Sequence, residues 1–445
     1  MNKNKIILII ILAIIFLLIG ILVINMKGTE NSSGKKIVRA YKIWIVGDDT
    51  SKFETFLADF KKTSGYSSTQ FLVESFPNFE DYYYSLASAM TRGEAPDMFV
   101  LNNNEKSLFE EQVLGIGPSI ITPSNFRKNF KRIFGDELIV TTKDGDKGVE
   151  FLKGIPIGYE TLGIYYNRKY IVSKDLTSLS SLSNVVSKLK KKNPSVIPIG
   201  MGNGTTVYGS NDIITQFFLL EDGVTGINNL SSNQLKSALS TYMMYGGKYG
   251  DNNYNSSFDS LKYSGKNNLD LFTEGKTFMV VGYPRLLNEI EKRGYSKAYL
   301  EASVFPHYSP TKGKSLINYN YFVLNKDSAN KELGFELLQY MSSEKGAKEY
   351  LSVFPYYLPS QISLERDLLE NKVSERFNVL LKDFYKFEHE LGSFDKGVAS
   401  IYNKDIKRVL DDSTNYISQY ESLSKKLLCK KEKFLTLKNP SVSCE

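Results

Sequence analysis

The chain has 445 residues, of which 42% are hydrophobic and 24% charged, and this composition excludes an intrinsically disordered protein. The length exceeds what one hydrophobic core usually organises, so we expect at least two lobes. The formal net charge is +7, but the basic excess lies in residues 1–40 and 424–445. Residues 41–423 carry 44 basic against 46 acidic side chains. A nucleic-acid-binding protein carries a basic stripe on its folded surface, so we do not expect nucleic acid as a partner.

The N-terminus is strongly apolar. Ile6 to Ile24 is a run of nineteen uncharged residues, close to the roughly 20 that span a bilayer as a helix. The apolar part of a cleavable signal is usually about 7–15 residues long. Neither a small-residue cleavage site nor a lipid-attachment cysteine follows. We therefore expect residues 1–27 to form an uncleaved single-pass membrane anchor, with the bulk of the chain extracytoplasmic. A cleaved signal peptide with an unusual site is the alternative.

Residues 28–36, GTENSSGKK, are small and polar and predict a short flexible linker. After them, strand and helix patterns alternate. The β-branched run Ile37–Val46 predicts a strand, and Ser51 and Glu54 have capping-box spacing for a helix that Gly65 ends. A strand, a helix and a further strand follow at 70–74, 79–92 and 98–101. This alternation predicts a parallel sheet whose ligand site lies at the strand ends, near Asp48, Asp49 and Asn102–Asn104.

The segment Gly154–Arg168, GIPIGYETLGIYYNR, is an apolar, tyrosine-rich run that begins at a proline. It predicts a strand that enters a sheet and crosses between two lobes, with Tyr159 and Glu160 where the crossing opens onto solvent. Upstream, Thr141–Gly148 contains acids but lacks the later ligands of a calcium loop, so a hairpin turn is expected.

The later part of the chain continues the α/β pattern. Phe272–Gly282 predicts a helix end, a glycine turn and a strand, with Pro284 at the first position of the next helix. Residues 325–328 are expected to cap a helix at 330–341. From Leu364 to about Leu428 the pattern predicts helix, and no internal repeat is found.

The sequence shows no catalytic signature. Only two histidines occur, His307 and His389, and neither an H-E-x-x-H nor a G-x-S-x-G motif is present. We therefore expect no enzyme, no cofactor and no metal site, although a pair of glycosidase carboxylates stays open as an alternative. The two cysteines, Cys429 and Cys444, could form a disulfide in an oxidising exterior or stay as free thiols.

Several motifs in register carry a resemblance to a known family. In chain order they are LASAMTRGEAPDMFVLNNN, GIPIGYETLGIYYNR, FTEGKTFMVVGYP, the stretch from Val304 to Gly346, and VFPYYLPS. Together they resemble the extracellular solute-binding proteins of family 1, the maltose-binding-protein-like receptors of ATP-driven importers. The similarity covers about residues 37–428.

The resemblance implies a two-lobed α/β periplasmic-binding-protein-like fold with three hinge crossings, preceded here by one N-terminal transmembrane helix. The expected first lobe comprises residues 37–155 and 306–356, and the second lobe residues 156–305 and 357–428. Residues 429–445 form a basic C-terminal tail.

The resemblance also implies a function. The protein is expected to be a monomeric receptor that closes on a solute, a carbohydrate, and delivers it to the permease subunits of an ABC importer. The expected ligand-binding residues are Asp48, Asp49, Asn102, Asn103, Asn104, Tyr159, Glu160, Thr205, Tyr208 and Tyr283. Phe394 and Tyr402 are candidates for a further cleft aromatic.

Structural roles stay open for these residues. Tyr283 could belong to the core or its rim, Glu160 could be a hinge group, and Asp48 and Asn102–Asn104 could be turn formers. The near-neutral body argues against an anionic ligand. The alternative function is an anchored scaffold or sensor partner that keeps the fold but acts through protein contacts.

Overall fold

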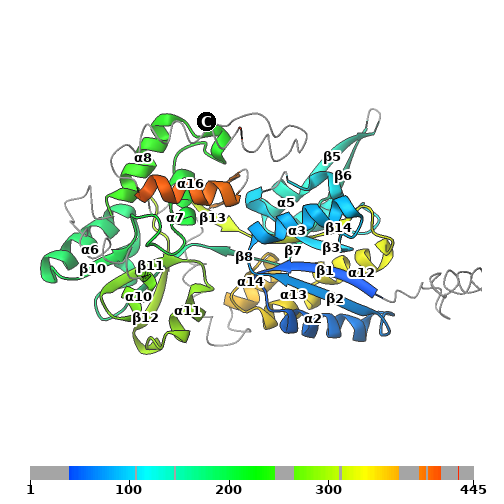
Figure 1. Ribbon diagram of the computed structural model, residues 1–445, viewed down its shortest axis with the longest axis horizontal. Coiled ribbons are helices and arrows are strands. Elements are labelled where there is room, and N and C mark those ends of the chain that lie inside the picture. The colour runs from blue at the N-terminus through cyan, green and yellow to red at the C-terminus, as the bar shows by residue number, and fades with distance from the viewer. Residues whose placement is uncertain are drawn as a thin grey trace, which may run out of the picture.

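The computed structural model describes residues 40–105, 108–144, 147–245, 265–309, 313–369, 390–396, 399–411 and 429. The predicted anchor at 1–27, the linker at 28–36 and nearly all of the tail lie outside these ranges. Within the described part, no helix combines the length and apolar character needed to cross a membrane. The described chain forms two α/β lobes side by side, joined by strands that run between them (Figure 1).

The first lobe is built on a mixed sheet of strand order β2-β1-β3-β14-β4, with β7 paired to β14. β1 is parallel to β2 and β3, as the strand–helix alternation predicts. β14 is antiparallel to β3 because it enters the sheet from the other lobe, so the complete sheet is mixed. The strands are β1 (Ala40–Val46), β2 (Gln70–Phe76), β3 (Met98–Asn102), β4 (Val113–Leu114), β7 (Ile155–Pro156) and β14 (Asn320–Asn325).

Helices cover both faces of this sheet, with α2 and α3 on opposite sides (Figure 1). The N-cap of α2 is Asp49, whose side chain accepts a hydrogen bond from Lys52 N at 3.1 Å. The predicted capping box that starts at Ser51 is therefore wrong by two residues. The helix buries one face, formed by Phe53, Phe56, Leu57 and Phe60. The helices of this lobe are α2 (Thr50–Thr63), α3 (Phe79–Arg92), α4 (Pro123–Asn129), α5 (Arg132–Leu138), α12 (Lys331–Ser342), α13 (Glu344–Val353) and α14 (Ile362–Leu369).

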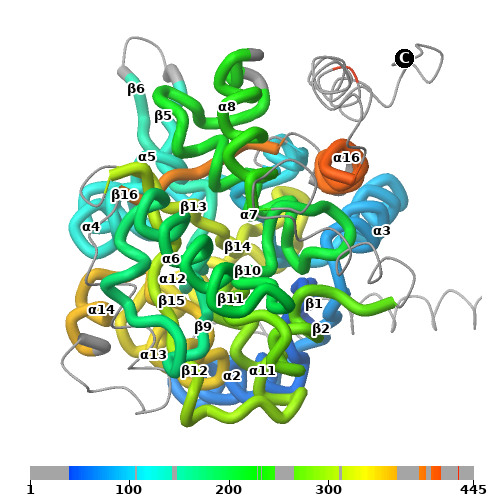
Figure 2. The backbone as a smooth tube through the Cα atoms, turned by 90° about the vertical axis from the view of Figure 1, so that its left-hand side faces the viewer, coloured from blue at the N-terminus to red at the C-terminus, as the bar shows by residue number. Residues whose placement is uncertain are grey.

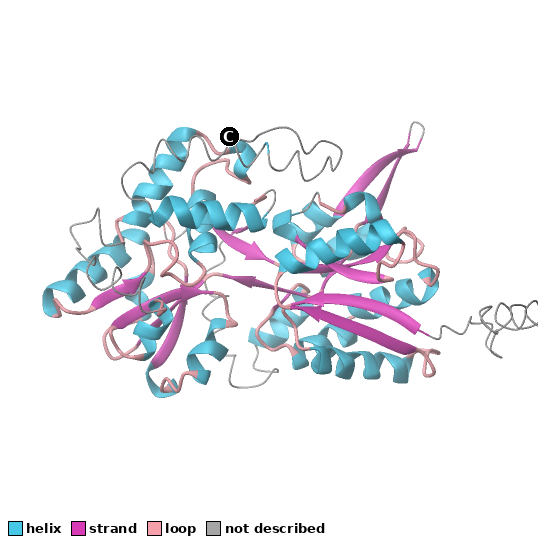
Figure 3. Cartoon of the chain, in the orientation of Figure 1, coloured by secondary structure: helices cyan, strands magenta, loops and turns pink. Residues whose placement is uncertain are grey.

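A two-stranded hairpin projects from the first lobe (Figure 3). Its strands are β5 (Ile139–Asp144) and β6 (Lys147–Leu152), which pair antiparallel from Ile139↔Leu152 to Asp144↔Lys147. The hairpin confirms the turn predicted at Thr141–Gly148.

The second lobe has a four-stranded sheet of order β10-β11-β9-β12. β9 is antiparallel to β11. As for β14 in the first lobe, the reason is that β9 enters its sheet from the crossing between the lobes. Gly275 adopts a φ of 74° between α10 and β11, which confirms the predicted helix end, glycine turn and strand. The strands are β9 (Gly163–Asn167), β10 (Ile197–Gly200), β11 (Thr277–Gly282) and β12 (Leu300–Val304).

Six helices in the described part surround this sheet. α16 runs toward the first lobe in Figure 1 and is seen end-on in Figure 2. α11 begins at Leu286 with Arg285 as its N-cap, so Pro284 precedes the helix instead of opening it. The helices are α6 (Leu179–Lys192), α7 (Ser210–Leu219), α8 (Ser232–Met243), α10 (Asn268–Thr273), α11 (Leu286–Lys292) and α16 (Ala399–Asp411).

The segment Gly154–Arg168 contributes to three sheets in succession. β7 belongs to the first lobe, β8 (Gly158–Thr161) to a crossing sheet, and β9 to the second lobe. The predicted crossing is confirmed. The crossing sheet has the order β15-β8-β13-β16, and its other strands are β13 (Lys314–Asn318), β15 (Leu358–Pro359) and β16 (Glu390–Gly392).

β16 also corrects the prediction of helix from Leu364 to Leu428. The described part of this stretch contains α14 and α16 with a strand between them. α14 contacts α13 and β15, and its Glu365 pairs with Lys131 at 2.6 Å, whereas residues from 357 onward were expected in the second lobe.

The first-lobe core is rich in aromatic side chains. Phe53 lies 5.7 Å from Phe322 between ring centroids, and Tyr350 contacts both rings. Trp44, the only tryptophan of the chain, lies on β1 with its ring centroid 5.0 Å from that of Phe76.

Candidate functional site

The two lobes face each other across a cleft of about 620 Å³. The first lobe contributes the ends of β1 and β3 and the N-terminus of α3, while the second contributes the start of α7 and one face of α16. Ligand sites of α/β sheets lie at strand ends of this kind. The described lining residues are Val46, Gly47, Pro77, Asn78, Phe79, Glu80, Asn102, Asn104, Glu105, Asn211, Asp212, Arg285, Asn318, Asn320, Lys396, Asn403, Lys404 and Lys407.

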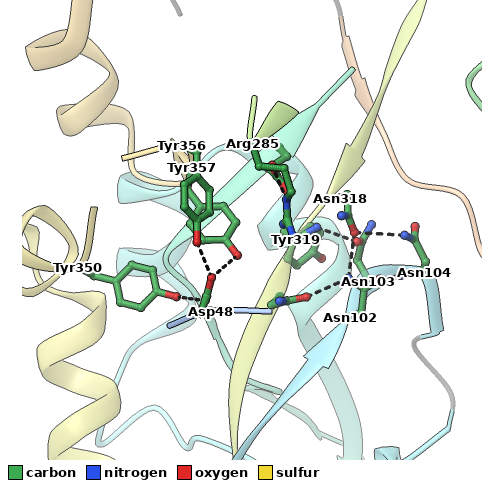
Figure 4. Close-up of polar contacts among 12 residues, drawn as sticks. Asp48, Asn102, Asn103, Asn104, Arg285, Asn318, Tyr319, Tyr350, Tyr356 and Tyr357 are labelled. Carbon is green, nitrogen blue, oxygen red and sulfur yellow. Dashed lines mark hydrogen bonds and ion pairs between the residues drawn. The ribbon is translucent and has the colours of Figure 1, made fainter. Parts of the chain in front are cut away.

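Four asparagines form a hydrogen-bonded network on the first-lobe wall (Figure 4). The strand register places Asn102 opposite Asn320. Asn102 Nδ2 donates to Oδ1 of both Asn318 and Asn320 at 2.9 Å, and Asn104 Nδ2 donates to Asn318 Oδ1 at 3.2 Å. Asn104 Oδ1 is buried and has no hydrogen-bond partner among the described residues. The network fixes the direction in which each amide faces the cleft.

Asn103, between two cleft residues, has a different role. Its side chain is fully buried, and its Nδ2 donates to Ile317 O at 3.1 Å and to Ser393 Oγ at 2.9 Å. Its Oδ1 accepts from Tyr319 N at 2.9 Å. These bonds join β3 to the crossing segments. Asn102 and Asn104 thus line the cleft, whereas Asn103 points away from it and stabilises the segments packed behind the cleft wall.

Asp48 lies beneath the cleft and is buried. Its carboxylate accepts hydrogen bonds from the hydroxyl groups of Tyr350 at 2.9 Å, Tyr356 at 2.8 Å and Tyr357 at 3.1 Å (Figure 4). Burial raises the pKa of Asp48, and the three hydrogen bonds oppose that rise. These bonds already occupy both carboxylate oxygens, so a solute reaching Asp48 would have to displace tyrosines.

Glu160 forms an ion pair between the crossing and the second lobe. Its side chain is completely buried, and Arg285 Nε donates to its two oxygens at 2.9 and 2.8 Å, with Nη2 donating to Oε2 as well. The Arg285 guanidinium also lies 5.8 Å from the ring centroid of Tyr356. Glu160 does not open onto solvent as predicted, because Arg285 covers it.

The second-lobe wall carries another ion pair. Lys396 Nζ pairs with Asp212 Oδ1, and Lys396 N donates to Asn104 O at 3.0 Å, so this lysine touches both lobes. Asn211 Nδ2 donates to Asp212 Oδ1 at 3.1 Å and to Asn403 Oδ1 at 2.9 Å. The start of α7 and the face of α16 are therefore held together at the cleft.

The other predicted ligand residues do not line the cleft. Asp49 is the exposed N-cap of α2. Tyr159 is buried, with its ring centroid 5.9 Å from that of Phe134. Thr205 bonds through its N and Oγ1 to Asp411.

Two further tyrosines lie close to the cleft. Tyr208 is 43% exposed, and its N donates to Asn268 Oδ1 at 2.8 Å. The hydroxyl of Tyr283 is buried, and burial followed by the charge of Asp212 raises its pKa. The candidate aromatics Phe394 and Tyr402 are both in the second-lobe core.

Most of the cleft residues were not predicted from the sequence. Asn318 and Asn320 flank the junction of two strands within the stretch from Val304 to Gly346, and their alternation could have identified them. Arg285 directly follows the predicted strand-end tyrosine and proline. Lys404 and Lys407 were not predicted as site residues, because their segment was predicted as part of one long helix with no indication that it lies beside the cleft.

Neither a metal site nor a disulfide is part of the described cleft. In the described ranges, no three His, Cys, Asp or Glu side chains are grouped to hold a metal ion. Cys429 is disulfide-bonded, and Cys444 lies outside the described residues, so the predicted pairing stays a prediction.

The fold and the interlobe cleft define a two-lobed solute-binding protein. Residues 55–368 match the family model described as bacterial extracellular solute-binding protein. Because this match covers more than half of the chain, the protein belongs to that family. No curated protein matches the sequence.

Solved structures share this fold at low sequence identity. An ABC substrate-binding protein from Listeria monocytogenes, in complex with cycloalternan, is 15% identical with a TM-score of 0.66, covering 89% of this chain and 99% of that one. The sugar-binding protein MalE from Xanthomonas citri is 15% identical with a TM-score of 0.64, covering 90% and 100%. The GacH receptor of Streptomyces glaucescens, studied unliganded and with acarbose, is 13% identical with a TM-score of 0.60, covering 88% and 99%.

Proposed function

We propose that the protein is an extracytoplasmic receptor that closes its lobes around a carbohydrate and delivers it to the permease of an ABC importer. The observation that carries the proposal is the cleft, whose described lining contains seven asparagines drawn from both lobes. Amide groups supply the directional donors and acceptors that sugar hydroxyls require. The ligands named for the similar structures, cycloalternan and acarbose, support a saccharide. We further propose that residues 1–27 hold the receptor at the membrane.

The test is a thermal-shift screen of the full chain against mono- and oligosaccharides, polyols and polyamines. A ligand at about one hundred times its dissociation constant adds about 2.7 kcal/mol to the free energy of unfolding, which gives a clear rise in Tm. Asn211→Ala and Asn320→Ala, one from each side of the cleft, are expected to weaken binding about tenfold each.

Asn125→Ala is the matched control, because Asn125 is an exposed asparagine on α4 outside the cleft. It is expected to bind like the unaltered protein. Equal losses in all three variants, or no shift with any saccharide, would contradict a carbohydrate site in this cleft.

One observation favours a second candidate, the anchored scaffold or sensor partner. Phe79 is the only aromatic residue in the described lining of the cleft, whereas sugar sites commonly stack flat aromatic rings on the sugar face. A scaffold would give no shift with any solute, while a protein partner would protect its outer surfaces from hydrogen exchange.

A further inference from the structure

Three asparagine side chains of the cleft have their amide oxygen in a hydrogen bond, while their NH2 group remains available to a ligand. Within the asparagine network the oxygens of Asn318 and Asn320 are occupied by Asn102 Nδ2, so each turns its own Nδ2 away from the network. Asn403 repeats this pattern on α16, since its Oδ1 accepts from Asn211 Nδ2. Across the described chain, none of these three NH2 groups has a hydrogen-bond acceptor. An amide whose oxygen is already bonded can offer a ligand only its donor side.

Two lysines on α16 add positive charge to the second-lobe wall, beside Asn403. Lys404 and Lys407 are three residues apart, so they lie on one face of the helix together with Asn403. Both line the cleft, and the described residues provide no ion-pair partner for either. The other basic residues of the lining are neutralised, Arg285 by Glu160 and Lys396 by Asp212.

The first-lobe wall carries acceptors as well as the NH2 groups of Asn318 and Asn320. Glu80 lies in the first turn of α3, where a carboxylate is stabilised by the helix dipole. Asn104 Oδ1 is a buried acceptor without a partner in the described chain, and such a group is costly unless a ligand donates to it. A sugar hydroxyl is a donor of the kind that this oxygen lacks. The unpaired lysines and free NH2 groups can donate to acceptors on a ligand, and charged oxygens make the stronger bonds.

We propose that the ligand is an acidic saccharide, whose anionic group binds Lys404 and Lys407 and whose hydroxyl groups bind the asparagine network. This inference rests on the proposed function and narrows its ligand class. A carboxylate, a phosphate or a sulfate on the sugar satisfies the same donors. The near-neutral charge of the whole body does not oppose the inference, because the charges of the cleft are divided between its two walls.

The experiment is calorimetric titration of the full chain with sugars that share one skeleton: glucose, glucuronate, glucose 6-phosphate, glucose 6-sulfate and glucosamine, then their oligomers. The acidic members are expected to bind at least tenfold more tightly than glucose, with affinity that falls as salt rises. The uronate, phosphate and sulfate arms identify which anion the site takes. Inorganic phosphate alone is expected to bind weakly, because it lacks the hydroxyl groups.

Lys404→Gln with Lys407→Gln is expected to lower the affinity for the acidic members to that for glucose, which abolishes the preference. Arg408→Gln is the matched control, since it removes a positive charge from an exposed position of the same helix outside the cleft lining. Tighter binding of glucose or glucosamine would overturn the acidic-ligand inference and keep the carbohydrate receptor. No binding of any member would count against both. Equal losses in the double variant and in Arg408→Gln would also overturn it.

Discussion

Asp48 follows β1 with the hydroxyl groups of three tyrosines directed at its carboxylate. Two of these tyrosines are in the segment that leads to β15, and the third is on α13, so one carboxylate ties the end of a strand to elements about 300 residues away. A buried carboxylate that kept its charge without such bonds would cost several kcal/mol. The residue is therefore a structural centre of the first lobe at the floor of the cleft.

The pH dependence of stability tests this role. Burial raises the folded pKa of Asp48 above its unfolded value of about 3.9. Its contribution is therefore fully present below the unfolded pKa and lost as pH rises through the folded pKa. In Asp48→Asn this loss should vanish. The free energy of unfolding of the unaltered protein, relative to this variant, is expected to fall from about pH 4 upward, by about 1.4 kcal/mol for each pH unit by which the pKa is raised.

Asp49→Asn is the control and has the opposite sign. Its side-chain hydrogen bond from Ser51, followed by the backbone bond from Lys52, lowers the pKa of Asp49. Its contribution is present above the unfolded pKa and is lost on acidification. Urea titrations across the pH range measure both slopes, and parallel slopes for the two variants would contradict the assignment.

The roles of individual site residues were harder to predict from the sequence than the fold. The strand ends at Asp48 and Asn102 could be placed, because local alternation and glycine turns mark them. Their partners could not, because Tyr350, Tyr356 and Asn318 are brought to them only by tertiary pairing. The same limit explains Glu160, whose buried partner Arg285 is 125 residues away.

At the scale of elements, the crossing segment Gly154–Arg168 was predictable, because its proline, glycines and tyrosines form a local sequence pattern that does not depend on distant contacts. Gly158 shows how closely the crossing strands pack. A Cβ there would lie 2.6 Å from Tyr357 Cβ and 3.1 Å from Leu358 O, which is where β8 pairs with β15. β16, by contrast, has three residues, too few for a periodic pattern to separate it from the flanking helices.

Gly158→Ala is expected to destabilise the protein by about 1–3 kcal/mol, because the added methyl group overpacks the pairing of β8 with β15. Gly117→Ala is the matched control, since its Cβ meets only Ser119 Oγ at 3.9 Å. Chemical denaturation measures both. A Gly158→Ala midpoint equal to that of Gly117→Ala would show that the crossing tolerates the extra volume.

At the scale of the whole molecule, the two lobes share core. One cluster of buried residues joins Phe53 and Phe322 of the first lobe to Phe272 and Leu286 of the second. The second-lobe sheet links this cluster to the other, since the neighbours Met279 and Val280 on β11 belong to different clusters. The fold is thus continuous from one lobe to the other.

We expect a single cooperative thermal transition for the described body. In differential scanning calorimetry the calorimetric and van't Hoff enthalpies should agree, as they do for a two-state unit. Two resolved transitions, or a calorimetric enthalpy well above the van't Hoff value, would show that the lobes unfold separately.

The single tryptophan gives the molecule an intrinsic optical reporter. Trp44 lies two residues before the cleft residue Val46 and belongs to the first lobe alone. Its emission therefore follows the environment of β1 without a contribution from the second lobe. If both lobes unfold together, its melting curve superimposes on circular dichroism of the whole chain.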